Sequence, residues 1–185
     1  MDWAWILKSA RFRPRTFCEC GVGPLEISAA AEVYRLGLAD KFTLIEPNPQ
    51  LADAAQEAMP YADVHRFAIG LDPAPGATMT LRLNGGSSYL DGTWAPTPSD
   101  GQTVVVDVKP FTAVDTGSID ALVLDCEGQE YSVLRRMRSR PRYLSVEVWR
   151  SHPEAEDIFQ WLANNDYRPL FSTGPEGETI FCERA

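Results

Sequence analysis

Short apolar runs alternate with amphipathic segments along the first seventy residues of the chain. Three runs typical of buried strands and two segments with helical periodicity follow one another at 16–20, 24–36, 41–46, 48–59 and 63–69. Pro24 suits the first turn of the first helix, and Gly37 suits its end. Asn48 and Pro49 form an N-cap and first helical position for the second helix. This β-α-β-α-β order predicts the nucleotide-binding half of a doubly wound sheet.

The same alternation returns in the second half of the chain. Strands are expected at 119–125, 143–149, 167–172 and 178–182, with helices at 129–138 and from Pro153 onward. The last two strands are joined by the Gly- and Pro-containing turn 174–177, which predicts an antiparallel hairpin. The pattern as a whole predicts an α/β fold with a mostly parallel sheet and helices on both of its faces.

The region 71–115 interrupts the alternation. It contains two extended segments, 77–83 and 103–108, separated by residues 84–102, which are rich in Gly, Ser, Pro and Asp. A loop of this length in a compact domain is usually functional. We therefore expect an inserted strand pair that carries a loop over the functional site, within a single domain spanning 1–185.

Charge and hydropathy restrict the function. The chain carries 26 acidic and 17 basic residues, a net charge of −9, which is unlike a protein that tracks a nucleic-acid backbone. No stretch approaches the length of a membrane span, and the start lacks a signal-peptide pattern, so a cytoplasmic location is expected. Five arginines lie in the segment 134–142. They suit the last turn of a helix, with an anionic substrate or partner as the alternative.

The four cysteines predict no metal site. Cys18, Cys20, Cys126 and Cys182 have no CxxC spacing, and three of them lie in apolar strand-like runs, so reduced thiols in the core are expected.

A glycine turn follows the first strand, in the sequence Glu19-Cys-Gly21-Val-Gly23. Glycines at a strand-to-helix junction let the backbone approach a ligand closely. The dinucleotide fingerprint GxGxxG would require glycine where Glu26 stands, which argues against a nicotinamide cofactor. Glu19 instead suits a ligand with a cationic amino group.

Acidic residues also follow two other strands. Glu46 ends the second strand, where a carboxylate can accept both hydroxyls of a ribose, although an ordinary acid at a strand end is the alternative. Asp125 and Glu127 follow a buried strand that should neighbour the first. Because ligands bind at the carboxyl ends of parallel strands, these acids and the glycine turn should face one crevice.

These motifs, in this order, resemble the FkbM-type methyltransferases. The resemblance covers about residues 16–165, and its most specific parts are the EPNP turn 46–49, the GSS segment 86–88 and the strand leading into Asp125-Cys-Glu-Gly-Gln-Glu. It implies a class I, Rossmann-like methyltransferase fold and S-adenosylmethionine as cofactor. It also implies methyl transfer to a hydroxyl oxygen of a small-molecule acceptor, such as a sugar or a natural product.

The resemblance assigns roles residue by residue. The residues expected to contact the cofactor are Glu19, Gly21, Gly23, Glu46, Pro47, Asn48, Ala68 and Ile69. Asp125 and Glu127 are expected to face the sulfonium and the acceptor, with His152 as a further candidate base. Ser87, Ser88 and Glu147 are expected to contact the substrate.

The sequence departs from the family pattern after the first glycine, where Val22-Gly23-Pro24 replaces the usual Ala-Asn and a further glycine. This keeps open the alternative of a module that binds S-adenosylmethionine without catalysis. A nicotinamide-dependent oxidoreductase is a third alternative, weakened by Glu26 and by the lack of a separate substrate domain. The oligomeric state has no signature in the sequence.

Overall fold

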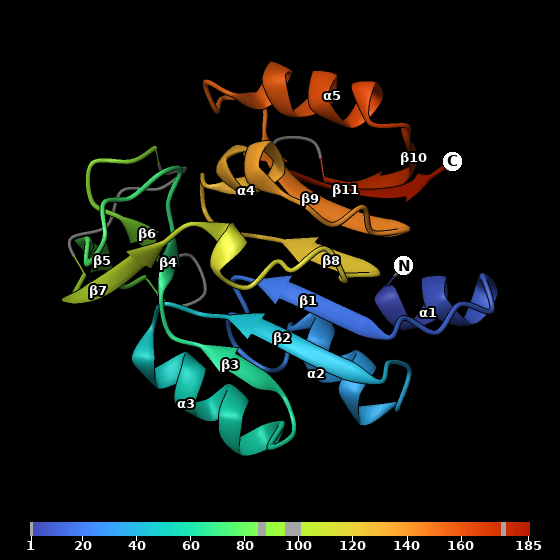
Figure 1. Cartoon of the computed structure of the whole chain (residues 1–185), viewed down its shortest axis with the longest axis horizontal. Helices are drawn as coiled ribbons and strands as arrows, with labels where there is room; N and C mark the ends of the chain where they lie inside the picture. Colours follow the sequence, from blue (N-terminus) through green and yellow to red (C-terminus); the bar gives the residue numbers. More distant parts are fainter. Residues whose placement is uncertain (1, 85–87, 95–100, 175–176) are drawn as a thin grey trace.

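A seven-stranded sheet forms the centre of the molecule (Figure 1). The computed structural model describes residues 2–84, 88–94, 101–174 and 177–185. The strand order across the sheet is β10 (Tyr167–Thr173), β11 (Gly177–Arg184), β9 (Tyr143–Trp149), β8 (Ala121–Leu124), β1 (Thr16–Cys20), β2 (Lys41–Ile45) and β3 (Asp63–His65). The five strands from β9 to β3 run parallel. β11 pairs antiparallel with both β9 and β10. The mostly parallel sheet and its antiparallel C-terminal hairpin are confirmed.

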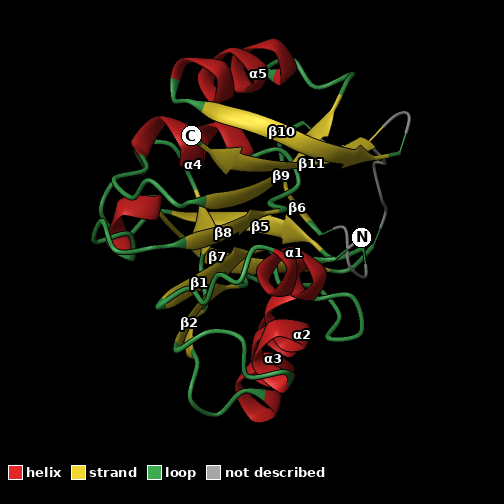
Figure 2. Ribbon diagram, turned by 90° about the vertical axis from the view of Figure 1, so that its right-hand side faces the viewer, coloured by secondary structure: helices red, strands yellow, loops and turns green. Residues whose placement is uncertain are grey.

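Helices cover both faces of this sheet (Figure 2). One face packs against α1 (Trp3–Ser9), α2 (Ala29–Arg35) and α3 (Pro49–Ala58). The other face packs against α4 (Glu130–Arg136), α5 (Ala155–Asn164) and the 3-10 turn η1 (Phe111–Ala113). Side chains of β1 alternate between the two layers: Phe17 packs in the first, and Cys18 in the second. Two apolar cores result, one on each side of the sheet.

The insertion forms a second sheet beside the carboxyl ends of the parallel strands. Its strand order is β4 (Ala68–Ile69), β7 (Thr103–Lys109), β5 (Thr78–Arg82) and β6 (Tyr89–Leu90). The antiparallel pairing of β5 with β7 confirms the expected strand pair. The single strand expected at 63–69 is wrong. It divides because β3 pairs with β2 whereas β4 pairs with β7, so the chain leaves the large sheet at Arg66–Phe67.

Two helix assignments also require correction. Helix α2 begins at Ala29 rather than at Pro24, because Ser28 is its N-cap and accepts a hydrogen bond from the Ala31 N–H. Helix α1 was not expected from the sequence. Asp2 caps it by accepting from the Trp5 N–H, and the Trp3 indole donates to the Ser145 hydroxyl 3.2 Å away.

The cap at the start of α3 is confirmed. The Asn48 side chain accepts from the Gln50 N–H at 3.1 Å, and Pro49 is the first helical residue. The four cysteines are free thiols, and all except Cys126 are buried. No helix among the described residues is long and apolar enough to cross a membrane.

Candidate functional site

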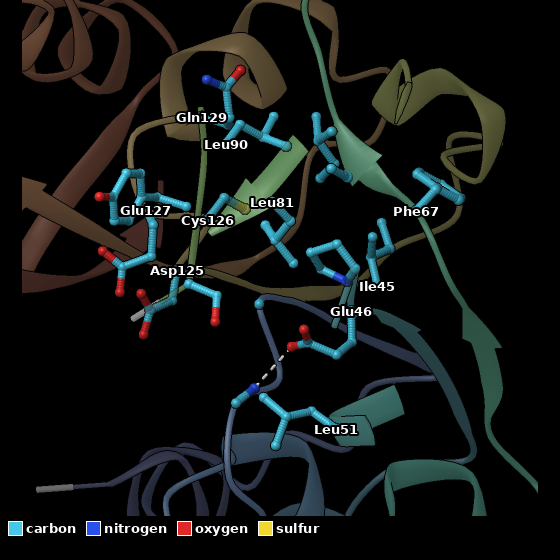
Figure 3. Close-up of a pocket in the computed structure, with 17 residues that line it drawn as sticks. Ile45, Glu46, Leu51, Phe67, Leu81, Leu90, Asp125, Cys126, Glu127 and Gln129 are labelled. Carbon is cyan, nitrogen blue, oxygen red and sulfur yellow. Dashed lines mark hydrogen bonds between the residues drawn. The ribbon is translucent and has the colours of Figure 1, made fainter. Parts of the chain in front are cut away.

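A pocket of about 540 Å³, including its open mouth, lies between the carboxyl ends of the parallel strands and the small sheet. Figure 3 shows Asp125 and Glu127 on one side of the pocket, and Phe67 and Ile45 on the opposite side. The pocket therefore has an acidic end and an apolar end.

The glycine turn forms part of the wall between these ends. The Gly21 N–H donates to the Ile45 carbonyl at 2.9 Å, and Gly21 has a φ of +80°. A Cβ atom built on Gly21 would lie 1.7 Å from the carbonyl oxygen of Asp125. The ends of β1 and β8 thus meet backbone to backbone, which only glycine permits at this position.

Glu46 lies on the floor of the pocket and is 4% exposed. Its two carboxylate oxygens accept hydrogen bonds from the Asn48 N–H at 2.8 Å and from the Gly23 N–H at 3.1 Å, the latter drawn in Figure 3. Burial raises the pKa of this carboxyl, against the lowering effect of its backbone donors. Glu46 therefore joins the first two strand ends and presents an acceptor group to the pocket.

The apolar end contains residues that the motifs did not identify. Ala68 and Ile69 line it as expected, and Pro47 lines the pocket beside Glu46. The additional apolar lining comes from Leu51, Phe67, Leu81, Tyr89 and Leu90. These residues come from α3, the β3–β4 connection and the insertion, so their convergence depends on the tertiary fold. Their shape and polarity suit a flat aromatic group such as a purine.

The turn after β8 carries the acidic end. Asp125 continues the sheet, because its N–H donates to the Cys20 carbonyl at 3.0 Å. Glu127 has a φ of +49°, which is rare for a residue with a side chain, and Gly128 follows with a φ of +98°. A Cβ on Gly128 would lie 3.0 Å from the carbonyl oxygen of Trp94. Such strain is typical of functional turns.

Glu130 holds this turn in place and was missed as a functional residue. Its carboxylate accepts from the Cys126 N–H at 2.6 Å and from the Gly128 N–H at 3.1 Å. Burial raises its pKa to about 7, against the lowering effect of its backbone donors. Glu130 thus positions the Asp125–Glu127 turn.

The titration of Glu130 predicts a pH-dependent stability. Because the pKa is about 4.5 in the unfolded chain and about 7 in the folded one, the native state binds more protons between these values. The free energy of unfolding should therefore fall as pH rises from 5 to 8, by up to about 3 kcal/mol for this group. Glu19 has a similarly raised pKa of about 7, so its titration changes the stability in the same direction.

Urea denaturation across this pH range measures the effect. The variant Glu130→Gln keeps a side-chain oxygen as acceptor but cannot ionise, so it should lose its own part of the slope and keep the parts due to Glu19, Glu46 and Asp125. An unchanged slope in the variant would remove Glu130 as a source of the effect.

Three carboxylates meet at the acidic end. Asp125, Glu127 and Glu147 each offer an oxygen, and these atoms all lie within 4.8 Å of one another. Desolvation first, and then the charges of Glu147 and Glu127, raise the pKa of Asp125 well above its usual value, although Asp125 is exposed. Oxygen ligands of this kind suit a hard divalent cation. The sequence predicts that the functional site uses no metal ion, and this stays a prediction.

Glu19 lies outside this pocket. Its carboxylate accepts from the Ser28 hydroxyl at 2.6 Å and from the N–H groups of Ala29 at 2.9 Å and Ala30 at 3.0 Å, so it caps α2. Burial raises its pKa to about 7. Glu19 lines a neighbouring crevice beside α1 and α2, and Asp125 lines both cavities.

His152 is fixed by backbone groups. Its Nδ1 accepts from the Glu154 N–H at 3.1 Å, and its ring also bonds to the backbone of Gly128. The ring of Trp94 packs edge-on against it, 4.7 Å between centroids. Desolvation lowers the pKa of His152. This arrangement makes His152 a link between the β9–α5 connection and the Gly128 turn.

The remaining predicted residues have different positions. Gly23 lines the pocket, and Asn48 binds Glu46 without lining it. Ser88 lines the pocket from the insertion, whereas Ser87 lies outside the described residues. Residues 84, 88–94, 101 and 102 of the expected cover are described, and they include the short strand β6.

Comparisons with known proteins agree with this geometry. A model of the family described as methyltransferase FkbM domain matches residues 19–169. A search of curated proteins finds no match.

Among solved structures, methyltransferase FkbM from Methylobacillus flagellatus KT is 13% identical, with a TM-score of 0.54 over 91% of this chain and 43% of that one. The ribosomal protein L11 methylase from Lactobacillus delbrueckii subsp. bulgaricus is 13% identical, with a TM-score of 0.53 over 98% of this chain and 75% of that one. The protein Thermoplasma acidophilum 1320 is 10% identical, with a TM-score of 0.55 over 98% of this chain and 81% of that one. These likenesses show the fold.

Proposed function

We propose that this chain, which belongs to the methyltransferase FkbM domain family of S-adenosylmethionine-dependent enzymes, is an O-methyltransferase. Its acceptor would be a hydroxyl oxygen of a sugar or of a small natural-product-like molecule. One observation carries the proposal: the ends of β1, β2 and β8 bring Gly21, Glu46 and Asp125 to one pocket. When bound, S-adenosylmethionine supplies an electrophilic methyl group on a sulfonium.

The lining fits this cofactor in shape and charge. Glu46 would accept the ribose hydroxyls, and the apolar end around Phe67 and Ile69 would hold the adenine. The carboxylates of Asp125 and Glu127 would stabilise positive charge at the other end. The close approach of Gly21 to Asp125 leaves backbone rather than side chains along the wall between them.

Asp125 has the properties of a general base for the acceptor. Desolvation and the neighbouring carboxylates raise its pKa well above its ordinary value, which moves it toward the range in which a base works well near neutral pH. Asp125 also lines the second crevice, so an acceptor there would approach the cofactor beside this carboxylate. Positioning of the hydroxyl in line with the methyl group would supply much of the remaining catalysis.

A panel assay tests the proposal. The protein is incubated with S-adenosylmethionine and a set of sugars, amino sugars and hydroxylated natural products, and S-adenosylhomocysteine formation is measured. O-methyl products identified by mass spectrometry would support the proposal. N-methyl products alone would contradict the hydroxyl acceptor while leaving the family assignment intact.

We expect Glu46→Ala to weaken S-adenosylhomocysteine binding by about 10- to 100-fold, since a hydrogen bond to a charged group contributes about 1.5–3 kcal/mol. Calorimetry measures the affinity. Glu46→Gln distinguishes loss of the ribose contact from disruption of the turn, because its amide oxygen can still accept a hydrogen bond from the Asn48 N–H. Glu57→Ala, an exposed acid on α3, is the control for loss of charge. Wild-type affinity in a folded Glu46→Ala variant would exclude Glu46 from the site.

A further inference from the structure

A separate polar pocket lies at the amino-terminal end of β9, whereas the methyltransferase site lies at the carboxyl ends of the parallel strands. It is lined by Arg140, Arg142, Arg168, Glu183, Arg184 and Ala185, and we call it the arginine pocket. The C label in Figure 1 lies at this end of the sheet. β9 begins at Tyr143 beside the arginine pocket and ends at Trp149. A seven-residue strand spans about 20 Å, so the two sites are separate.

Two of its guanidinium groups are held in position. Arg140 uses one nitrogen, Nη1, to donate to the carbonyls of Met137 and Ser139, both at 2.9 Å, and it packs over the Trp161 ring. Arg142 packs over the rings of Phe12 and Tyr143, at 5.3 and 5.4 Å. Arginine presents five donors in a rigid fork. In the part of the chain that the structure describes, Arg140 donates these bonds through Nη1, which leaves Nη2 and Nε for another acceptor.

The other two arginines come from the C-terminal hairpin. Arg168 lies opposite Glu183, and Arg184 opposite Tyr167, in the register of β10 and β11. The Arg184 N–H donates to the Arg142 carbonyl at 2.9 Å, which joins the hairpin to the segment before β9. Within the described part of the chain, the buried Nε of Arg184 has no hydrogen-bond acceptor. Buried donors are normally paired with protein or with water, so this nitrogen can donate to an added acceptor.

Charge makes the pocket unusual for this chain. The protein has a net charge of −9, yet four arginines line this pocket with a single acidic side chain, that of Glu183. Glu183 is already bound by Arg142 at 3.1 Å and by the Tyr143 hydroxyl at 2.9 Å. The remaining guanidinium groups therefore exceed the local negative charge. Such an excess of positive charge favours an anion with several acceptor oxygens.

We propose that the arginine pocket binds a phosphate-bearing ligand, either a soluble phosphate compound or a phosphate headgroup at a lipid surface. Guanidinium groups match the geometry of phosphate oxygens bidentately, which distinguishes them from lysine point charges. The proposal accounts for the arginines of the segment after α4 that lie beyond the helix, which the methyltransferase site does not use. It does not depend on methyl transfer.

Inorganic pyrophosphate is the first probe, titrated into the protein in a low-salt buffer and followed by calorimetry. We expect saturable binding that weakens as salt is added, because the pocket is open to solvent. The double variant Arg168→Gln/Arg184→Gln should bind at least tenfold more weakly. Arg168 is exposed on its strand, so Arg168→Gln alone should fold and should show a smaller loss of binding. It keeps the proposal testable if the double variant misfolds. Arg66→Gln, on the far side of the sheet beside Asp53, is the control for lost charge.

A second arm uses vesicles containing phosphatidic acid, with phosphatidylcholine vesicles as the blank. Binding of pyrophosphate alone identifies a soluble ligand, and binding of phosphatidic acid vesicles alone identifies a headgroup; either supports the proposal if Arg168→Gln reduces it. Absence of binding in both arms would overturn it. So would equal binding by wild type, Arg168→Gln and Arg66→Gln. S-adenosylhomocysteine affinity should be unchanged in every variant.

Discussion

Asp125→Asn should fold and bind S-adenosylhomocysteine normally, yet lose methyl transfer by about 10²- to 10⁴-fold, the usual contribution of a positioned base. The carboxylate lines both the cofactor pocket and the neighbouring crevice. Its pKa is raised well above the ordinary value by desolvation and by Glu147 and Glu127. Asparagine keeps the shape but cannot accept a proton.

The measurement is kcat with an acceptor found in the panel, together with the affinity for S-adenosylhomocysteine and the urea midpoint. Glu130→Gln is a useful comparison, because it alters the support of the same turn without removing the proposed base. If Asp125 only stabilised the start of the following turn, the variant would keep both its stability and its turnover, because asparagine caps a turn as well as aspartate does. Full turnover by folded Asp125→Asn would exclude the catalytic role.

Gly21→Ala is expected to abolish measurable cofactor binding and to destabilise the fold. The added Cβ would lie 1.7 Å from the Asp125 carbonyl oxygen, a backbone atom that cannot move without separating the ends of β1 and β8. A positive φ of 80° adds strain for any residue with a side chain. Overpacking of this kind costs about 1–3 kcal/mol or more.

Gly23→Ala provides the matched control, since it adds the same methyl group two residues away. Gly23 also has a positive φ, of 60°, but a Cβ there meets nothing within 4 Å. Only the conformational penalty, about 1–2 kcal/mol, is expected. Thermal unfolding and calorimetry with S-adenosylhomocysteine compare the two variants. Equal effects would show that backbone strain, and not the contact with Asp125, accounts for the need for glycine.

The parallel sheet could be predicted because its signals are local. Each apolar run is short, and the start of α3 is signalled by two adjacent residues, the N-cap Asn48 and the first helical residue Pro49. Strand-end acids such as Glu46 and Asp125 follow from the same reasoning, since parallel strands end at one edge. Their arrival in one pocket is a consequence of the strand order and not of their spacing in the sequence.

Long-range contacts explain what the sequence left open. The cap of α2 depends on Glu19, ten residues before the helix, so the periodicity alone placed the helix start too early. Helix α1 has seven residues, and its position depends on Trp3 reaching Ser145, 142 residues away. The role of Glu130 depends on the left-handed backbone of Glu127, which no propensity indicates.

The division of one expected strand into β3 and β4 has a consequence for how such enzymes diversify. The chain enters the small sheet through β4 and returns through β7, and these two strands lie side by side. An element whose entry and exit are adjacent can be exchanged without altering the distance that the rest of the chain must span. Residues between β4 and β7 supply Leu81, Ser88 and Leu90 to the pocket. A graft between Ile69 and Lys109 would therefore exchange this part of the pocket lining while the rest of the chain keeps its course.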